Sequence, residues 1–181
     1  MCATCFELLE PTTAPGAIAS AFAYGGPMAD ALRKLKYGGR RDVARSLAPL
    51  LATALAAAGR DCELIIPVPL GQRRLWARGY NQAERLAHYA GALVGLPLDR
   101  RSLRRNRSTL PQARLDRVAR QANVRGAFVV PAGRRARLRG RSILLFDDVA
   151  TTGATLTAAA VALGEAGAGR VSLFAAARRD S

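Results

Sequence analysis

The 181-residue sequence has little of several features that define common classes of protein. Its three cysteines are too few for the disulfide framework of a small secreted domain. Its uncharged run at residues 149–164 contains threonine and glycine throughout and does not make a membrane span. The N-terminal residues MCATCFELLEP contain acids where a signal peptide has basic residues and a long apolar run. These absences favour a cytoplasmic protein of one domain, with at most a short appendage.

Negative charge is also scarce, because 13 acidic residues stand against 28 basic ones and the net charge is +15. Only Lys34 and Lys36 are lysines, and every other basic residue is an arginine. Residues 100–141 hold 14 arginines and one acid, Asp116, so this segment carries +13 of the net charge. A cluster of this kind predicts a polyanionic partner, such as a phosphate or a nucleic acid.

Apolar periodicity and turn residues predict helices and strands in alternation. Helices are expected at residues 28–36, 41–58, 115–122 and 155–166. Another helix is expected to start at Asn81, where Glu84 three residues later resembles a capping box. Strands are expected at residues 64–68, 127–130, 142–146 and 171–176. This alternation predicts an α/β fold with a parallel sheet of about five strands flanked by helices.

Four stretches are expected to lack regular structure. Residues 1–27 are interrupted by prolines and glycines. The polar stretch 71–80 and the basic stretches 100–112 and 134–141 are expected to be loops, the first basic one mobile.

The most informative stretch is residues 143–155, which read ILLFDDVATTGAT. An apolar strand runs into Asp147 and Asp148, and a polar turn then opens a helix. In parallel sheets, ligands bind at the carboxyl ends of strands. Hydroxyls and N–H groups at a helix N-terminus suit a phosphate, and the two acids suit sugar hydroxyls or a hydrated Mg²⁺ beside it. An ordinary capped strand–turn–helix is the alternative. A Walker B strand is a weaker one, because no G-x-x-x-x-G-K-[ST] segment accompanies it.

This stretch resembles the phosphoribosyl pyrophosphate (PRPP) motif of type I phosphoribosyltransferases. That motif consists of an apolar strand, an acidic pair and then T-T-G-x-T. Three further blocks are similar to successive segments of the ComF competence proteins, also called the GntX-like family: AFAYGGPMADALRKLKYGG, IIPVPLGQRRLWARGYNQAERLA and RRNRSTLPQARLDRVARQANVRGAF. The four blocks lie in order and cover most of residues 21–178. The resemblance implies a type I phosphoribosyltransferase fold with a small N-terminal hood. It also implies that residues 1–27 are the remnant of a zinc ribbon and that residues 28–181 form the phosphoribosyltransferase-like domain.

The resemblance also implies which residues bind PRPP. Asp147 and Asp148 would bind the ribose hydroxyls, with Mg²⁺ held mainly by substrate oxygens. The 5′-phosphate would lie on the turn formed by Thr151, Thr152, Gly153, Ala154 and Thr155. The pyrophosphate would lie on the segment that contains Arg73, Arg78, Gly79, Asn81 and Gln82. A mobile loop that closes over the ligand or contacts DNA would contain Arg104, Arg105, Arg107, Thr109 and Gln112. The residues alone leave a solvated or nucleic-acid-binding surface as a second explanation of that loop, and they assign no catalytic base.

Cysteine and aromatic residues give weaker signals. ComF-like proteins often carry a zinc ribbon with two C-x-x-C pairs, whereas here Cys2 and Cys5 form one incomplete pair. A structural zinc site needs four ligands, and Cys62 is expected to be a core thiol, so we expect no stable zinc site in this chain. Trp76 and Tyr80 lie among arginines, where they could stack nucleic-acid bases. Local packing is the simpler explanation for both rings.

The resemblance, taken with the charge pattern, implies three candidate functions. The first is a ComF-like protein that binds PRPP or a related ribose phosphate with magnesium and handles incoming single-stranded DNA in natural competence. Competence helicases and recombination proteins are its candidate partners. The second is a metabolic phosphoribosyltransferase that transfers ribose 5-phosphate to a base or an amine. The third is a non-catalytic module that senses PRPP and binds nucleic acid, so the residues leave open whether the protein is an enzyme.

Overall fold

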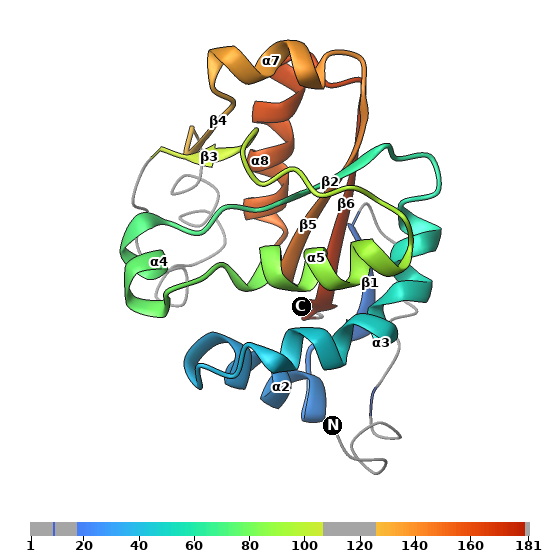
Figure 1. Ribbon diagram of the computed structural model, residues 1–181, viewed down its shortest axis with the longest axis vertical. Helices are drawn as coiled ribbons and strands as arrows, with labels where there is room; N and C mark the ends of the chain where they lie inside the picture. Colours follow the sequence, from blue (N-terminus) through green and yellow to red (C-terminus); the bar gives the residue numbers. More distant parts are fainter. Residues whose placement is uncertain (1–8, 10–17, 107–125, 180–181) are drawn as a thin grey trace.

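The computed structural model describes Leu9, residues 18–106 and residues 126–179. The expected helix 115–122 and the candidate residues Cys2, Cys5, Arg107, Thr109 and Gln112 lie outside this part of the chain. The elements follow one another as β1 (Ile18–Ala23), α2 (Gly26–Tyr37), α3 (Asp42–Ala58), β2 (Leu64–Pro67), α4 (Gln72–Arg78), α5 (Gln82–Leu93), β3 (Arg104–Arg105), β4 (Phe128–Val129), α7 (Ala132–Leu138), β5 (Ser142–Ala150), α8 (Ala154–Glu165) and β6 (Arg170–Arg178) (Figure 1).

Four strands form a parallel sheet in the order β1-β6-β5-β2. A separate antiparallel pair is formed by β3 and β4. The strand expected at residues 127–130 is therefore present as β4, but it lies outside the main sheet. The predicted α/β class with a parallel sheet is confirmed, and within the described residues this sheet has four strands, where about five were expected.

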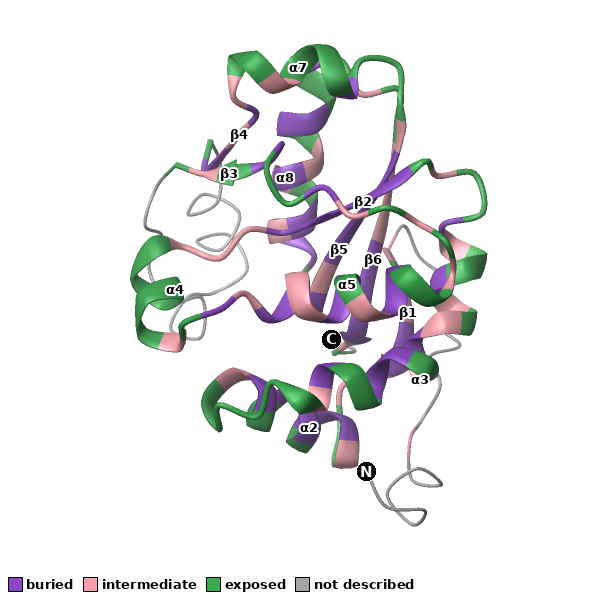
Figure 2. Cartoon of the chain, in the orientation of Figure 1, coloured by how far each residue is buried: buried purple, intermediate pink, exposed green. Residues whose placement is uncertain are grey.

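Helices cover both faces of the parallel sheet, and the alternation of side chains along β5 divides the core in two. Leu144 and Phe146 face the cluster built from α2, α3 and α5. Ile143 and Leu145 face the cluster built from α8 and the end of α7. All four side chains are fully buried. Figure 2 shows buried residues, in purple, along the strands of the parallel sheet. The end of β5 is therefore held from both sides, which fixes the residues that follow Phe146.

Strand β1 corrects the expectation that residues 1–27 are irregular. Ile18–Ala23 pairs in parallel with β6, from Ile18 opposite Leu173 to Ala23 opposite Arg178. The sequence of this strand, IASAFA, is rich in alanine and has a weak strand pattern. Its extended conformation depends on pairing with a strand at the other end of the chain, which no local pattern reveals.

Two stretches expected to be loops are helices instead. Residues 72–78 form α4, which ends at Gly79, a glycine in the left-handed region with φ 76°. The second basic stretch lies largely in α7. Arginine is a good helix former, and its long charged side chain stays in water on an exposed helix face. Charge density alone therefore did not distinguish these helices from loops. In the first basic stretch, Arg104–Arg105 is the short strand β3.

Strand β5 is longer than the expected strand 142–146, because its pairing with β6 continues to Ala150 opposite Arg178. Asp147 and Asp148 consequently lie within the strand rather than after it. Consecutive strand residues point to opposite faces of the sheet. The two carboxylates therefore leave the strand in different directions, a constraint that shapes the site.

Candidate functional site

A cavity of about 300 Å³, called the main cavity below because it contains both carboxylates of β5, lies at the carboxyl ends of β2 and β5. Its walls come from the last turn of α2, the segment after β2, α4, the start of α5, β3, β5 and α8. This is the edge of a parallel sheet at which ligands bind in α/β proteins. The residues predicted from the sequence that line the cavity are Arg78, Asn81, Gln82, Arg105, Asp147, Asp148 and Thr155.

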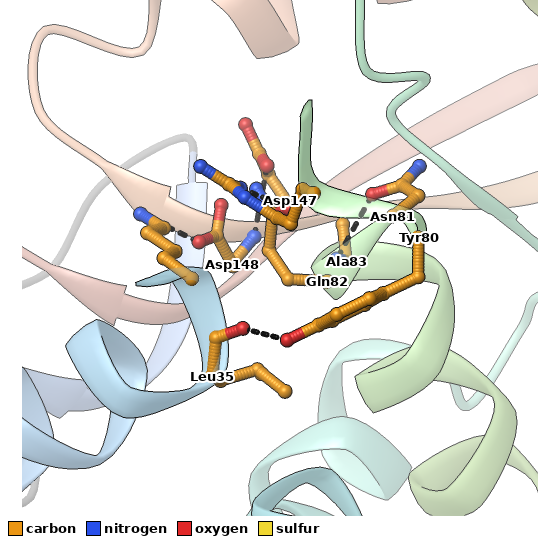
Figure 3. A network of polar contacts seen from close by, with 9 residues as sticks. Leu35, Tyr80, Asn81, Gln82, Ala83, Asp147 and Asp148 are labelled. Carbon is orange, nitrogen blue, oxygen red and sulfur yellow. Dashed lines mark hydrogen bonds and ion pairs between the residues drawn. The ribbon is translucent and has the colours of Figure 1, made fainter. Parts of the chain in front are cut away.

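The two carboxylates of β5 have different surroundings. The side chain of Asp148 is 6% exposed, and its Oδ2 atom lies 2.6 Å from the Lys36 Nζ atom (Figure 3). The backbone N–H of Asp148 donates a hydrogen bond of 2.8 Å to Asp147 Oδ1. Asp148 is thus paired with a cation, while the Asp147 carboxylate faces the cavity beside it.

These surroundings act on the protonation of both partners. Burial raises the pKa of Asp147 well above its usual value of 3.8, and the nearby Asp148 charge raises it further. Burial alone would lower the pKa of Lys36, but the Asp148 carboxylate outweighs burial and raises that pKa above 10.5. Lys36 therefore stays charged, and Asp147 is the carboxyl group that is costly to ionise.

Three arginines add positive charge to the same cavity. Arg74 and Arg78 come from α4, and Arg105 comes from β3. Burial lowers the pKa of Arg105, and the nearby Arg74 charge lowers it further, whereas Asp147 opposes this change. The Arg78 guanidinium donates a hydrogen bond to Gln82 Oε1 and lies 5.2 Å from the centre of the Tyr37 ring. The lining thus combines four cations with two carboxylates, which favours an anionic ligand that also carries hydroxyls.

The start of α5 holds the segment after β2 in place. Asn81 Oδ1 accepts a hydrogen bond of 3.1 Å from the backbone N–H of Ala83, and both residues are labelled in Figure 3. Asn81 Nδ2 donates a hydrogen bond of 2.9 Å to the Val68 carbonyl oxygen. The predicted N-cap role of Asn81 is confirmed. The hydroxyl of Tyr80 donates to the carbonyl oxygen of Leu35 in α2. Tyr80 is buried, so packing explains this ring, whereas Trp76 on α4 is 87% exposed.

The turn between β5 and α8 forms a small hollow beside the cavity. Thr151 and Thr152 are exposed, and Thr152 Oγ1 accepts a hydrogen bond of 3.4 Å from the Ala154 N–H. Gly153 has a φ of 74°, and a Cβ atom there would lie 2.4 Å from Ile18 Cδ1. The backbone conformation therefore favours glycine at this point, whereas the contact involves the end of the Ile18 side chain, which can rotate away. The turn residues Thr151, Thr152, Gly153, Ala154 and Thr155 all line this hollow, and Thr155 and Asp147 line the main cavity as well.

Several predicted residues lie outside the main cavity. Arg73 and Arg104 are exposed and do not line it. Gly79 lines a second cavity of about 420 Å³ together with His88. Arg105, which was predicted in the loop that closes over the ligand or contacts DNA, lines the main cavity.

Three cavity residues with polar or charged side chains were not predicted from the sequence, namely Lys36, Tyr37 and Arg74. One signal was available for Lys36, since lysine is so scarce in this chain. Cys62 is half-buried against the core, as expected of a core thiol. No group of three or more His, Cys, Asp or Glu side chains is close enough to hold a metal ion among the described residues. In the same part of the chain, no helix has the length and apolar character needed to cross a membrane.

Comparisons with known proteins were made at three levels. No family model matches the sequence. The chain is 32% identical over 156 residues to the DNA utilization protein YhgH of Shigella flexneri, a match that covers 83% of this chain and 67% of that protein. It is 31% identical over 160 residues to Competence protein F of Haemophilus influenzae, with 86% and 69% covered. A solved structure of the allosteric regulatory enzyme of purine biosynthesis matches 81% of this chain and 30% of its own at 16% identity, with a TM-score of 0.46.

Proposed function

The chain belongs to the family of Competence protein F and the DNA utilization protein YhgH. We propose that its main cavity binds PRPP or a related ribose phosphate. The observation that carries the proposal is the arrangement around the end of β5. An acidic pair and four cations line the cavity, and a threonine- and glycine-containing turn lines the hollow beside it, with Asp147 and Thr155 lining both.

Each part of a phosphorylated pentose has a matching group in this cavity. Ribose hydroxyls need acceptors, and the carboxylates of Asp147 and Asp148 accept hydrogen bonds. The 5′-phosphate needs N–H donors and hydroxyls, which the turn at residues 151–155 supplies at the start of α8. A diphosphate at C1 needs cations, and Arg74, Arg78 and Arg105 lie across the cavity. The volume of about 300 Å³ is at the lower end of small-molecule sites.

Magnesium fits this site as a companion of the ligand. Mg²⁺ prefers oxygen ligands in octahedral geometry and is usually held by one or two carboxylates together with substrate phosphates. The cavity offers the Asp147 carboxylate, while Asp148 is already paired with Lys36. When bound, Mg²⁺ would neutralise charge on the diphosphate. The arginines of α4 and β3 would bind the same group, and in a transfer reaction they would stabilise its charge as it leaves C1.

We also propose that the protein is cytoplasmic and handles single-stranded DNA in natural competence. The names of its relatives support a DNA-related role. The surface of α4 offers a physical basis, because none of its residues is buried and Trp76 stands exposed next to Arg73 and Arg74. An exposed aromatic ring among arginines stacks bases while the arginines bind phosphates. The further arginines of residues 100–141 add to the electrostatic attraction.

Calorimetry with PRPP and Mg²⁺ tests the sugar-phosphate site. The wild-type protein is expected to bind PRPP, and the double variant Asp147→Ala with Asp148→Ala is expected to lose roughly a hundredfold or more in affinity. The matched control is Asp30→Ala with Asp61→Ala, which removes two carboxylates whose side chains are 62% and 63% exposed. Unchanged affinity in a folded Asp147/Asp148 variant would refute the assignment.

Two further ligands separate the parts of the site. Ribose 5-phosphate binding is expected to depend on the acidic pair, whereas pyrophosphate binding is expected to depend on Arg74 and Arg78. Steady release of pyrophosphate with an acceptor base or amine would indicate a transferase. Tight PRPP binding without turnover would indicate a sensor of PRPP.

A further inference from the structure

Lys36 and Asp148 form an ion pair in the wall of the main cavity. Their side chains are 20% and 6% exposed, and the Nζ and Oδ2 atoms are 2.6 Å apart. The surface ion pairs Arg33–Asp30 and Arg170–Asp61 are far more exposed, since all four of their side chains are more than 60% exposed. Water therefore screens the Lys36–Asp148 pair much less than these surface pairs.

The last turn of α2 holds Lys36 at this place from both sides. The preceding residue, Leu35, accepts a hydrogen bond from the buried hydroxyl of Tyr80 (Figure 3). The following residue, Tyr37, has the Arg78 guanidinium over its ring. Three consecutive residues of α2 thus contact the segment just before α5, strand β5 and helix α4. The Lys36 ammonium is placed at Asp148 by the packing of the fold and not by a flexible surface chain.

This placement affects what else the acidic pair can bind. A divalent cation held by both Asp147 and Asp148 would lie within a few ångströms of the Lys36 ammonium. Asp148 would then have to share its charge between two cations, which repel each other in a poorly hydrated site. Arg105 and Arg74 add further positive charge next to Asp147. The empty cavity is therefore unfavourable for a metal ion that arrives alone.

We propose that Lys36 is the resident counter-cation of the acidic pair and excludes divalent metal from Asp147 and Asp148 until a phosphorylated ligand brings the metal on its own oxygens. The site would then admit metal and sugar phosphate together. This inference rests on the proposed function for the identity of the ligand. The exclusion of metal from the ligand-free protein does not depend on it.

Mn²⁺ binding to the ligand-free protein tests the inference, with free Mn²⁺ measured by electron paramagnetic resonance. Lys36→Met keeps a long helix-forming side chain and removes the charge. It is expected to bind Mn²⁺ about tenfold or more tightly than the wild type. Lys36→Arg keeps the charge and is expected to behave as the wild type. Lys34→Met is the matched control, because Lys34 is an exposed lysine on the same helix.

A second change locates the metal. Adding Asp147→Asn to Lys36→Met is expected to abolish the gained Mn²⁺ affinity. If the gain persists in this double variant, or if the wild type binds Mn²⁺ as tightly as Lys36→Met, the inference is overturned.

A measurement on the wild type keeps the test independent of how the variants fold. Mn²⁺ alone is expected to leave the backbone amide signals of Asp147 and Asp148 sharp in a ¹⁵N spectrum, and Mn²⁺ with PRPP is expected to broaden them. Selective broadening of these two signals by Mn²⁺ alone would overturn the inference. A protein that excludes Mn²⁺ yet binds no PRPP would refute the proposed function and leave the role of Lys36 intact.

Discussion

Tyr80 donates its hydroxyl hydrogen to the carbonyl oxygen of Leu35, and this buried contact joins the residue just before the N-cap of α5 to the last turn of α2. Both residues are buried, Leu35 completely. Because Lys36 follows Leu35 in the chain, the same contact also fixes the position of the Lys36 ammonium relative to Asp148. The last turn of α2 therefore provides both an acceptor for a structural hydrogen bond and one of the cations of the cavity.

Tyr80→Phe is expected to destabilise the fold by about 1–2 kcal/mol, because the variant loses this buried hydrogen bond and leaves the Leu35 carbonyl oxygen without that donor. Urea unfolding measures the change. Tyr37→Phe is the matched control, since the Tyr37 residue is 79% exposed. Loss of its hydroxyl is expected to change the free energy of unfolding by no more than about 0.5 kcal/mol. Equal stabilities for the two variants would contradict this account of α2.

Asp147→Asn is expected to stabilise the folded protein at neutral pH while it weakens sugar-phosphate binding. Burial and the neighbouring Asp148 raise the pKa of Asp147 above 3.8 in the folded state, so the unfolded chain loses this proton first as the pH rises. The wild type therefore loses stability between the usual pKa and the raised one. Asparagine does not ionise, and its side-chain oxygen can still accept the Asp148 N–H.

Thermal unfolding between about pH 4 and pH 8 measures this effect as the difference in midpoint between the variant and the wild type. The difference is expected to grow as the pH rises. Asp30→Asn alters an exposed carboxylate and is expected to change the midpoint little at any pH. A difference in midpoint between Asp147→Asn and the wild type that is the same at every pH would show that ionisation of Asp147 does not lower the stability of the fold.

Gly153→Ala is expected to destabilise the protein by about 1–2 kcal/mol, because alanine is strained at a φ of 74° and its Cβ atom would collide with the Ile18 side chain. The backbone of the turn would shift to relieve the strain at this φ, so phosphate binding is expected to weaken as well. Chemical denaturation gives the first quantity and calorimetry with ribose 5-phosphate the second.

Gly164→Ala on the same helix α8 provides the control for Gly153→Ala. No heavy atom lies within 4 Å of a Cβ atom at Gly164, and its φ is not positive. Alanine there is expected to stabilise the helix by about 0.5–1 kcal/mol. A Gly153→Ala protein as stable as the wild type would mean that the turn tolerates a side chain.

Trp76→Ala is expected to weaken single-stranded DNA binding by about 1–3 kcal/mol without a change in its salt dependence, because a stacked base is lost but no phosphate contact. Arg73→Ala is expected to lower the slope of affinity against salt by about 0.7, the value for one phosphate on a single strand. Fluorescence anisotropy at several salt concentrations separates the two effects.

Leu93→Ala is the control for the DNA-binding variants, because Leu93 is an exposed apolar residue on α5, 59% accessible and away from α4. It is expected to bind DNA as the wild type does. If Trp76→Ala also binds as the wild type, α4 is not the surface that contacts DNA.

Local patterns predicted most of the elements around the site. The helices α2, α3 and α8 and the strands β2 and β6 occur where periodicity and breakers place them, because each signal lies within the element itself. The stretch from Ile143 to Thr155 likewise predicted a strand, an acidic pair and a turn in that order. Strand β1 and helix α4 were missed, since one depends on pairing with distant β6 and the other has no buried face to create a pattern.

The sequence by itself determined the acidic pair, the glycine turn and the arginines, because each is a short run of residues whose chemistry follows from the residue types and their order. Only the tertiary structure decided which of these groups share one cavity. Lys36 reaches Asp148 because α2 packs on the face of the sheet to which Asp148 points, and Arg105 reaches Asp147 from the separate pair of β3 and β4. Burial and electrostatic coupling act through space, so residues distant along the chain set the charge state of the site.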